Sequence, residues 1–234
     1  MNSYKQPEPF YRFIADVHLG ANPVMIKQFC HLISETPASC KGLYILGDLF
    51  DHWLGSDIHE TTYRELQDCF KALPFPVYFL PGNRDFLLED QWLEKAGITR
   101  IHDPYTLQIR EKNIILTHGD QFCTNDSAYQ WYRWLVRKPL SQAIFRKLPK
   151  SFRLFILGMI RKNGKSTTSS TQKANRYNIN LTRNLEANMN LFLMGHVHHP
   201  SLDHSLVVLA DWRRKDRCGF LDLEHASMKM TLLY

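Results

Sequence analysis

Residues 76–85 read PVYFLPGNRD, an apolar run that ends in a polar turn. Four other stretches have the same layout: YRFIADVH at 11–18, LYILGD at 43–48, NIILTHGD at 113–120 and LFLMGHVH at 191–198. Short runs that are rich in Ile, Leu, Val, Phe and Tyr and bounded by Gly or Pro are typical of buried strands. The sequence therefore predicts five strands that each end in a polar cluster.

Helical patterning separates several of these strands. Residues 23–35, PVMIKQFCHLISE, and residues 59–73, HETTYRELQDCFKAL, repeat apolar residues at helical spacing. Strands that alternate with helices predict an α/β sheet, in which ligands bind beyond the carboxyl ends of the strands. We therefore expect the polar residues at the strand ends to converge on one rim: Asp16, His18, Asp48, Asn83, Arg84, His118, His196 and His198.

Length and composition are those of a globular protein. The chain has 234 residues, of which 44% are hydrophobic and 22% charged, which is enough for one substantial domain. The first residues lack the basic-then-apolar layout of a signal peptide, and no apolar run reaches the roughly 20 residues of a membrane-spanning helix. Five scattered cysteines without a CxxC pair favour reduced thiols. A soluble cytoplasmic protein is expected, at most bound to a membrane surface.

The net charge of +6 is concentrated in one segment. Residues 127–185 contain 13 Lys and Arg and no Asp or Glu, whereas the rest of the chain has 16 basic and 23 acidic residues. Apolar and basic residues are mixed there at helical spacing, with breaks at Pro139 and Pro149, which predicts two or three amphipathic helices. We expect an inserted helical lid at 125–186 and a core made of 1–124 and 187–234, with terminal strands after residue 205.

The polar residues at the strand ends are suitable ligands for metal ions. Asp, Asn and His offer oxygen and imidazole donors without a thiolate, a set that suits manganese, iron or zinc. The seven donors are Asp16, His18, Asp48, Asn83, His118, His196 and His198. Each motif alone is also typical of an ordinary turn or a surface histidine cluster. Their repetition at five strand ends instead predicts a two-metal site of the kind that hydrolyses phosphate esters.

The order of these motifs, D-x-H, GD, GN, H and GHxH, resembles that of the calcineurin-like metallophosphoesterases over nearly the whole chain. The resemblance implies a four-layer αββα sandwich of two mixed β-sheets. It also implies two metal ions, with Asp48 bridging. One ion would take Asp16, His18, Asp48 and His198, and the other Asp48, Asn83, His118 and His196. Asn83 and His196 are expected to contact the substrate as well and, with Arg84, to take part in catalysis.

Arg84 departs from the commoner motif of this superfamily. Many relatives have GNHD or GNHE, in which the His donates a proton or contacts phosphate. A guanidinium does not usefully donate a proton at neutral pH, but it binds phosphate oxygens with a rigid pair of donors. We expect Arg84 to bind phosphate and to stabilise charge. A surface salt bridge with Asp85 or Glu89 is the alternative, and Asp85 is expected to hold the turn or to orient its neighbours.

Longer strings are similar to the family that hydrolyses UDP-2,3-diacylglucosamine in lipid A biosynthesis. These are YILGDLFDHWLGSD at 44–57, LPGNRDFLL at 80–88, THGDQFCTNDSAYQWYRWLVRKP at 117–139 and LADW at 209–212. The resemblance implies a manganese-dependent attack of water at the α-phosphorus, which gives UMP and 2,3-diacylglucosamine 1-phosphate. It also implies a peripheral protein on the cytoplasmic face of the bacterial inner membrane. We expect a monomer drawn to anionic lipid, with no nucleic-acid partner.

The same resemblance implies substrate contacts from the insertion. They are Asp126, Tyr129, Ser166, Ser170 and Lys173. The connector departs from the family pattern, since Ser170 replaces an Asn and RYNIN at 176–180 replaces IMDVN, and a rival register places Lys165 or Asn175 at the lipid. Of the aromatic residues Trp131, Trp134, Phe145, Phe152 and Phe155, we expect some to pack as core and others to line acyl chains.

Three other functions stay open on the sequence. A nucleotide or dinucleotide pyrophosphatase would use the same metals, but it would not need the amphipathic insertion. A non-catalytic binding module would be expected to lose a ligand or Arg84, and all are present. A nucleic-acid-binding protein would explain the basic segment, but the interleaved Leu, Ile and Phe fit lipid better.

Overall fold

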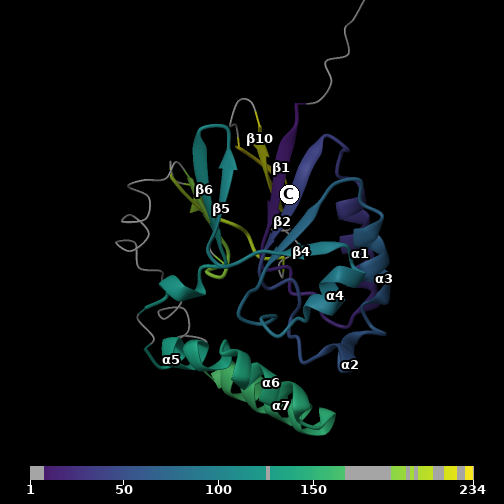
Figure 1. Ribbon diagram of the computed structural model, residues 1–234, viewed down its shortest axis with the longest axis vertical. Helices are drawn as coiled ribbons and strands as arrows, with labels where there is room; N and C mark the ends of the chain where they lie inside the picture. Colours follow the sequence, from purple (N-terminus) through teal and green to yellow (C-terminus); the bar gives the residue numbers. More distant parts are fainter. Residues whose placement is uncertain are drawn as a thin grey trace, which may run out of the picture.

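The computed structural model describes residues 8–124, 127–166, 191–198, 201–202, 205–212, 219–225 and 230–233. These residues form two β-sheets with helices on one side and at one end (Figure 1). The strands of the first sheet follow the order β11-β10-β1-β2-β3-β4, and those of the second the order β5-β6-β7-β9-β8. Five strands at the predicted positions, β1, β2, β3, β6 and β7, supply the polar loops of interest.

Both sheets are mixed. In the first, parallel strands β1 (Phe10–Ile14), β2 (Cys40–Leu46), β3 (Val77–Leu80) and β4 (Ile98–Arg100) are extended by antiparallel β10 (Phe220–Glu224) and β11 (Met230–Leu233). In the second, β6 (Lys112–Thr117), β7 (Leu191–Met194) and β9 (Leu206–Val208) are parallel, and β5 (Tyr105–Ile109) and β8 (Ser201–Leu202) are antiparallel at the edges. The prediction of an α/β fold with two mixed sheets is confirmed.

Alternation along the strands builds two cores. Successive side chains of a strand point to opposite faces, so neighbouring residues of β1 enter different clusters. Phe13 packs with Leu116 and Leu193 between the two sheets. Ile14 packs with Phe29 and the other residues under the helices. Both faces of the central strands are therefore buried, which fixes the positions at which these strands end.

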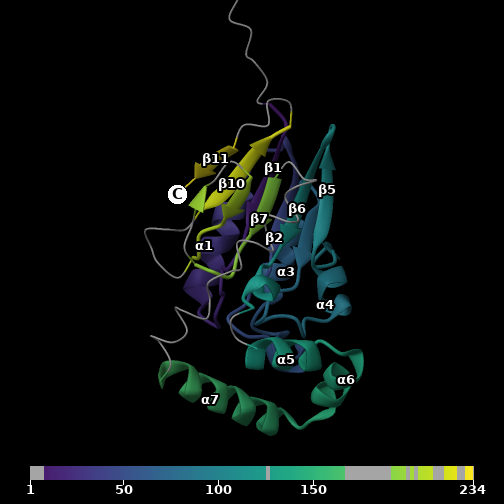
Figure 2. The same ribbon diagram turned by 90° about the vertical axis from the view of Figure 1, so that its left-hand side faces the viewer.

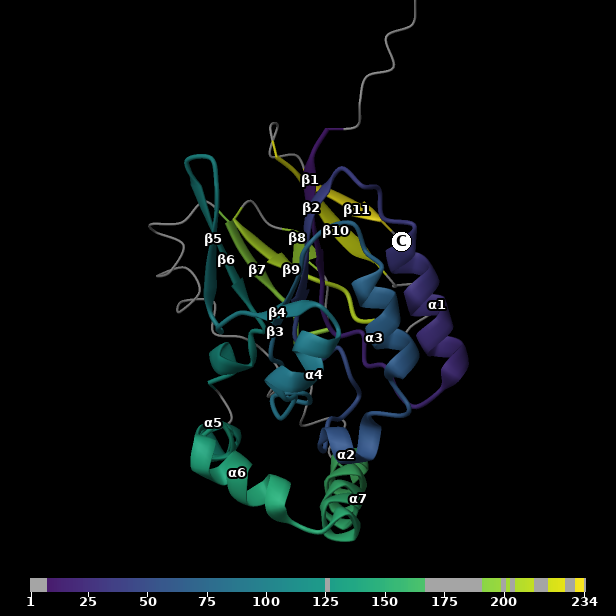
Figure 3. The ribbon, with the colours of Figure 1, turned by 45° about the vertical axis from the view of Figure 1, so that its right-hand side comes forward.

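Helices cover the outer face of the six-stranded sheet (Figure 3). They are α1 (Pro23–Ser34), α3 (Arg64–Lys71) and α4 (Asp90–Lys95). Helix α1 begins where the Asn22 side chain accepts a hydrogen bond from the Val24 amide and a proline occupies the first turn. With the two sheets, these helices give three layers of the predicted sandwich within the described ranges.

The predicted helix over 59–73 is wrong in its first half. The structure has a short α2 (Ser56–His59), then a turn at 60–63, then α3. Tyr63 lies in this break with its ring buried, and its hydroxyl donates to the Leu19 carbonyl oxygen at 3.1 Å. Two threonines precede it, and β-branched residues are poor helix formers, so a tertiary contact overrides a weak local preference.

Helices α5 (Ser127–Val136), α6 (Pro139–Lys147) and α7 (Lys150–Ser166) lie beyond one end of both sheets (Figure 2). The structure thus has three helices where two or three were expected. The breaks fall at the two prolines, since α6 begins at Pro139 and α7 begins just after Pro149. The boundaries of the predicted insertion, at 125 and 186, lie outside the described residues and stay a prediction.

Alternation of strands and helices alone suggested a single sheet, and this is wrong, whereas the predicted convergence on one rim is confirmed. Strands β1, β2 and β3 belong to the first sheet, and β6 and β7 to the second. Their carboxyl ends nevertheless meet at the same end of the molecule, the end that faces α5–α7 (Figure 1). The polar clusters therefore converge across the seam between two sheets.

Candidate active site

Most of the predicted metal ligands have an unusual backbone conformation. Positive φ angles are uncommon for residues other than glycine because the Cβ atom clashes with the backbone. Six non-glycine residues in the described ranges have positive φ, and five of them are Asp16, His18, Asp48, His196 and His198, at 53° to 67°. Such strain is tolerated where the surrounding structure imposes it, and it is concentrated at functional sites.

Two glycines allow the loops to approach one another. A Cβ atom on Gly82 would overlap the Asp48 carboxylate and backbone, and one on Gly195 would lie 2.5 Å from Asp16 Oδ2. Only glycine fits at such contacts. The GN dipeptide thus brings together two loops of the first sheet, and the GH dipeptide brings a loop of the second sheet against one of the first.

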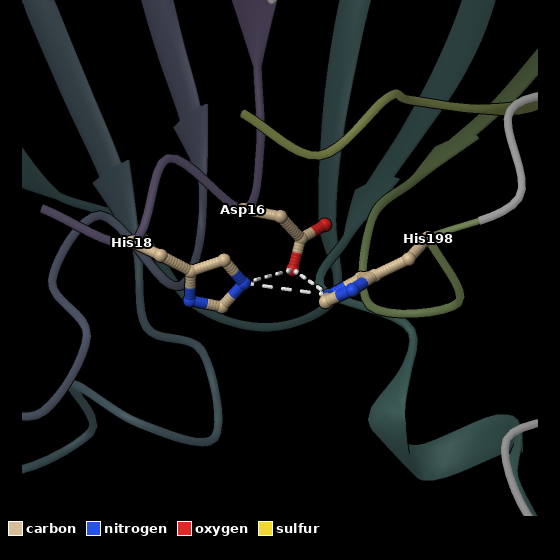
Figure 4. Close-up of side chains that lie close together, drawn as sticks. All are labelled: Asp16, His18 and His198. Atoms are coloured by element: carbon tan, nitrogen blue, oxygen red, sulfur yellow. Dashed lines mark hydrogen bonds and ion pairs between the residues drawn. The ribbon is translucent and has the colours of Figure 1, made fainter. Parts of the chain in front are cut away.

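The first ligand group consists of Asp16, His18 and His198 (Figure 4). The His198 Nε2 atom lies 3.2 Å from Asp16 Oδ1 and 3.4 Å from His18 Nε2. His18 Nε2 lies 3.7 Å from the same carboxylate oxygen. One oxygen and two imidazole nitrogens from β1 and β7 loops therefore converge on one point.

The second group contains Asn83, His118 and His196. The amide oxygen of Asn83 lies 2.9 Å from His118 Nε2 and 3.1 Å from His196 Nδ1. His118 Nδ1 lies 3.0 Å from the carbonyl oxygen of Leu46 and donates to it, so the neutral form of the imidazole has its lone pair on Nε2. In that form two acceptors, Nε2 and the Asn83 amide oxygen, face each other at close range, an arrangement that a cation between them would stabilise.

Asp48 lies between the two groups and is almost fully buried. Its Oδ1 atom is 3.7 Å from His118 Nε2, and its Oδ2 atom is 3.9 Å from His18 Nδ1. Its Oδ1 atom also accepts a hydrogen bond from the Arg84 amide at 2.9 Å. A carboxylate that contacts both groups suits the bridging position of a two-metal site.

The electrostatics of the cluster also fit bound cations. Burial raises the pKa of the Asp48 carboxyl to about 7 and lowers that of the His196 imidazole to about 3. Burial opposes charge on His118 too, but the carboxylates of Asp48 and Asp16 raise its pKa to about 9. Divalent cations would offset the buried negative charge and use the imidazole lone pairs. The donor set therefore fits the two-metal site of the superfamily.

The Arg84 side chain lies beside the same cluster of ligands. Its Nε atom lies 3.5 Å from Asp48 Oδ2, and its Nη1 atom lies 3.2 Å from Asp51 Oδ1. The alternative salt bridge with Asp85 or Glu89 is wrong. Asp85 instead accepts from the Gly82 amide at 2.8 Å and from two further backbone amides, so it holds the turn as expected.

Helix α5 is attached to this rim by a buried carboxylate. Asp120 accepts hydrogen bonds from Arg133 at 2.7 Å, Arg137 at 3.1 Å and the Tyr129 hydroxyl at 3.1 Å. Arg137 also donates to the Gly82 carbonyl oxygen at 3.1 Å. Basic residues that were expected beside lipid are therefore used partly inside the protein, where they fix α5 beside the predicted metal ligands.

The structure describes only some of the residues that were predicted to contact the substrate. The Tyr129 ring stacks on that of His196, with centroids 6.4 Å apart, so Tyr129 lies at the site. Asp126, Ser170, Lys173 and the rival Asn175 lie outside the described residues. Ser166 and the rival Lys165 belong to the last turn of α7, and the positions of their side chains are outside the described set.

A cavity of about 1030 Å³ opens beside the metal ligands. Asn83, Arg84 and Tyr129 line one part of it. Its other walls are largely apolar and come from the loop after β3 and from α5, α6 and α7: Phe86, Leu87, Val136, Phe145, Ile156 and Leu157. The polar rim and an apolar chamber under the helices are thus one continuous space.

Three further residues at the site were not singled out from the sequence. Asp211 lies 3.4 Å from His198 Nδ1, Asp120 binds α5, and Asp51 binds Arg84. All three lie within the strings LADW, THGDQ and LFDHW, which carried the resemblance. Sequence similarity therefore contained the signal, but their partners lie 13 to 33 residues away along the chain and could not be assigned from it.

Asp211→Asn should lower manganese affinity by about tenfold, because a carboxylate that binds the second ring nitrogen of a ligating His orients the ring and raises its basicity. Isothermal titration of the metal-free protein with Mn²⁺ measures this. Asp90→Asn, on an exposed carboxylate of α4, is the control. Unchanged affinity in Asp211→Asn would show that His198 does not depend on this contact.

Comparison with known proteins agrees with this geometry. The family model of the calcineurin-like phosphoesterases matches residues 12–200. The chain therefore belongs to the calcineurin-like phosphoesterase family and is a metal-dependent phosphoesterase.

More particularly, the chain is similar to two curated hydrolases. It is 32% identical to the UDP-2,3-diacylglucosamine hydrolase of Yersinia enterocolitica over 227 residues, and 34% identical to that of Yersinia pestis over 228 residues. Each match covers 94% of this chain and 94% of the relative. Among solved structures, vacuolar protein sorting 29 from Cryptosporidium parvum matches with a TM-score of 0.44 and 12% identity over 97% of this chain and 96% of that chain.

Proposed function

We propose that the protein hydrolyses the pyrophosphate bond of UDP-2,3-diacylglucosamine to UMP and 2,3-diacylglucosamine 1-phosphate. The observation that supports this substrate is the cavity, which joins the phosphate-binding rim to an apolar chamber. A substrate with two acyl chains and a pyrophosphate has the same two parts. Burying acyl chains stabilises the complex by about 0.8 kcal/mol per methylene, so an apolar chamber provides binding energy that a soluble nucleotide would not use.

The residues of the rim have separable tasks in this reaction. Two divalent ions, for which we propose manganese, would supply a water activated near neutral pH and charge stabilisation for the phosphoryl group. Asn83 and His196 orient the phosphoryl group beside Asp48, and Arg84 donates hydrogen bonds to its oxygens as negative charge develops. Tyr129 stacks on His196 and closes the side of the site under α5.

The direct test is hydrolysis of UDP-2,3-diacylglucosamine in detergent micelles with Mn²⁺, then with excess chelator. The expected result is metal-dependent release of UMP, detected by chromatography. Hydrolysis in ¹⁸O-labelled water should place the label in UMP, because water is expected to attack the α-phosphorus. Cleavage of bis(4-nitrophenyl) phosphate without UMP release would confirm phosphoesterase activity and reject UDP-2,3-diacylglucosamine as the substrate.

A lipid surface is the proposed location of the substrate. Thirteen large hydrophobic residues are exposed in the described ranges, and 11 of them belong to α5–α7, including Trp131, Leu140 and Phe155. Within those ranges, no helix is long and apolar enough to span a membrane. Residues 127–166 also lack acidic side chains. An apolar face on an acid-free helical unit fits binding to an anionic lipid surface.

Phe155→Ser should weaken binding to vesicles that contain phosphatidylglycerol by about 30-fold, because burial of a large apolar side chain is worth about 2 kcal/mol. Cosedimentation with vesicles measures the partition. Val24→Ser is a matched control, since Val24 on α1 has the same 61% exposure as Phe155 but lies away from α5–α7. Equal losses in both variants would contradict docking through these helices.

A further inference from the structure

The guanidinium of Arg84 has partners at Nη1 and near Nε. Its Nη1 atom donates to three acceptors from the loop after β2: the Asp51 carboxylate at 3.2 Å, the Asp51 carbonyl oxygen at 3.5 Å and His52 Nε2 at 3.4 Å. Its Nε atom lies 3.5 Å from Asp48 Oδ2. Within the part of the chain that the structure describes, Nη2 has no hydrogen-bond partner.

This distribution of partners decides which donors can serve a substrate. A guanidinium has five N–H donors in a fixed plane, so a contact that fixes Nη1 also fixes the direction of Nη2. Both hydrogens of Nη1 are occupied by the three acceptors. Arg84, Asp51 and His52 all line the cavity next to Asn83. Nη2 is therefore the donor left for a phosphoryl oxygen there.

The backbone makes this arrangement rigid. The amide of Trp53 donates to the Arg84 carbonyl oxygen at 2.9 Å, and the Arg84 amide donates to Asp48 Oδ1 at 2.9 Å. Segment 48–53 and the turn at 82–85 are thus joined through both the amide and the carbonyl group of Arg84. The side chains of Arg84 and Asp51 are 27% and 34% exposed, so their ion pair is screened by water and adds little stability.

We propose that Asp51, assisted by His52, is a positioning residue for Arg84: it fixes the guanidinium so that Nη2 faces the phosphoryl group of the substrate. This inference rests on the phosphate-binding role of Arg84 in the proposed function and adds the group that sets its geometry. Without Asp51 the long Arg84 side chain samples other rotamers, and small misplacements of a catalytic group are costly in rate.

A double-mutant cycle tests whether the effect of Asp51 on the rate requires Arg84. The substrate is bis(4-nitrophenyl) phosphate with saturating Mn²⁺, and the variants are Asp51→Ala, Arg84→Ala and the double variant. Asp51→Ala should lower kcat about tenfold in the native background, since positioning of the guanidinium is lost. The same substitution should have no effect when Arg84 is already alanine. Equal losses in both backgrounds would overturn the proposal.

Two further measurements separate positioning from a structural role. Inorganic phosphate, as a competitive inhibitor, should bind more weakly to Asp51→Ala, while manganese content and thermal unfolding stay at the native values. Asp51→Asn keeps an oxygen acceptor at the same place and should restore most of the lost rate. An amide variant as slow as Asp51→Ala, or one with lost manganese, would reject positioning.

Glu60→Ala is the matched carboxylate control. Glu60 pairs with Lys95 at 2.7 Å, away from the cavity, and its removal should leave the rate unchanged. Because the assay uses a generic phosphodiester, the cycle does not depend on the lipid substrate. Failure to cleave UDP-2,3-diacylglucosamine would reject the proposed substrate. The coupling of Asp51 and Arg84 would still be measured with the generic phosphodiester.

Discussion

Asp48→Ala should reduce phosphodiester hydrolysis by about 10³-fold or more, because both metal sites would lose a ligand and charge stabilisation by the metals is worth several kcal/mol. The two oxygens of Asp48 lie 3.7 Å from His118 and 3.9 Å from His18, one in each ligand group.

The measurement combines rate and metal content. Bound manganese after dialysis is determined by elemental analysis, and hydrolysis of bis(4-nitrophenyl) phosphate is followed with added Mn²⁺. Asp68→Ala, on an exposed carboxylate of α3, should match the native protein in both. Thermal unfolding shows whether loss of the Arg84 amide contact disturbs the turn. Native activity or native metal content in Asp48→Ala would reject the bridging role.

Arg84→Ala should lower kcat by about 10²-fold while manganese content stays native, since loss of one preorganised donor to a developing charge has about this effect. The Arg84 side chain approaches Asp48 but is not itself among the metal donors. Arg84→Lys should recover little, because an ammonium cannot bind Asp51 and a phosphoryl oxygen with the same fixed geometry.

Comparison of kcat and KM shows whether Arg84 acts on substrate binding or on the transition state. A loss confined to KM would mean that Arg84 binds substrate and transition state equally. Loss of manganese in Arg84→Ala would show that it supports the metal site instead. Arg64→Ala, which removes an exposed arginine of α3, controls for the change in net charge.

Local sequence was sufficient to predict the strand ends and the convergence of the polar residues that follow them. Each of β1, β2, β3, β6 and β7 is apolar along its length and ends at a polar cluster, and both signals are encoded within about ten residues. Because carboxyl ends of neighbouring strands share an edge, convergence of Asp16, Asp48 and Asn83 followed from the topology.

Features of the structure that depend on contacts between distant residues could not be predicted from the sequence. The division into two sheets is set by packing of Phe13 and Ile14 into different cores, and both are simply apolar in the sequence. Arg133 and Arg137 bind Asp120 inside the protein, and this pairing forms only when α5 packs against the loop after β6. Charge counting alone assigned such residues to a lipid surface.

The left-handed backbone at five of the ligands puts function and stability in opposition at single positions. Glycine adopts positive φ without steric cost, so replacing Asp16, His18, Asp48, His196 or His198 by glycine removes a ligand and relieves strain of about 1 kcal/mol or more. A copy of this fold released from catalysis would have no steric reason to keep side chains at these backbone angles. In this chain, aspartates and histidines stand at five positions whose backbone conformation favours glycine.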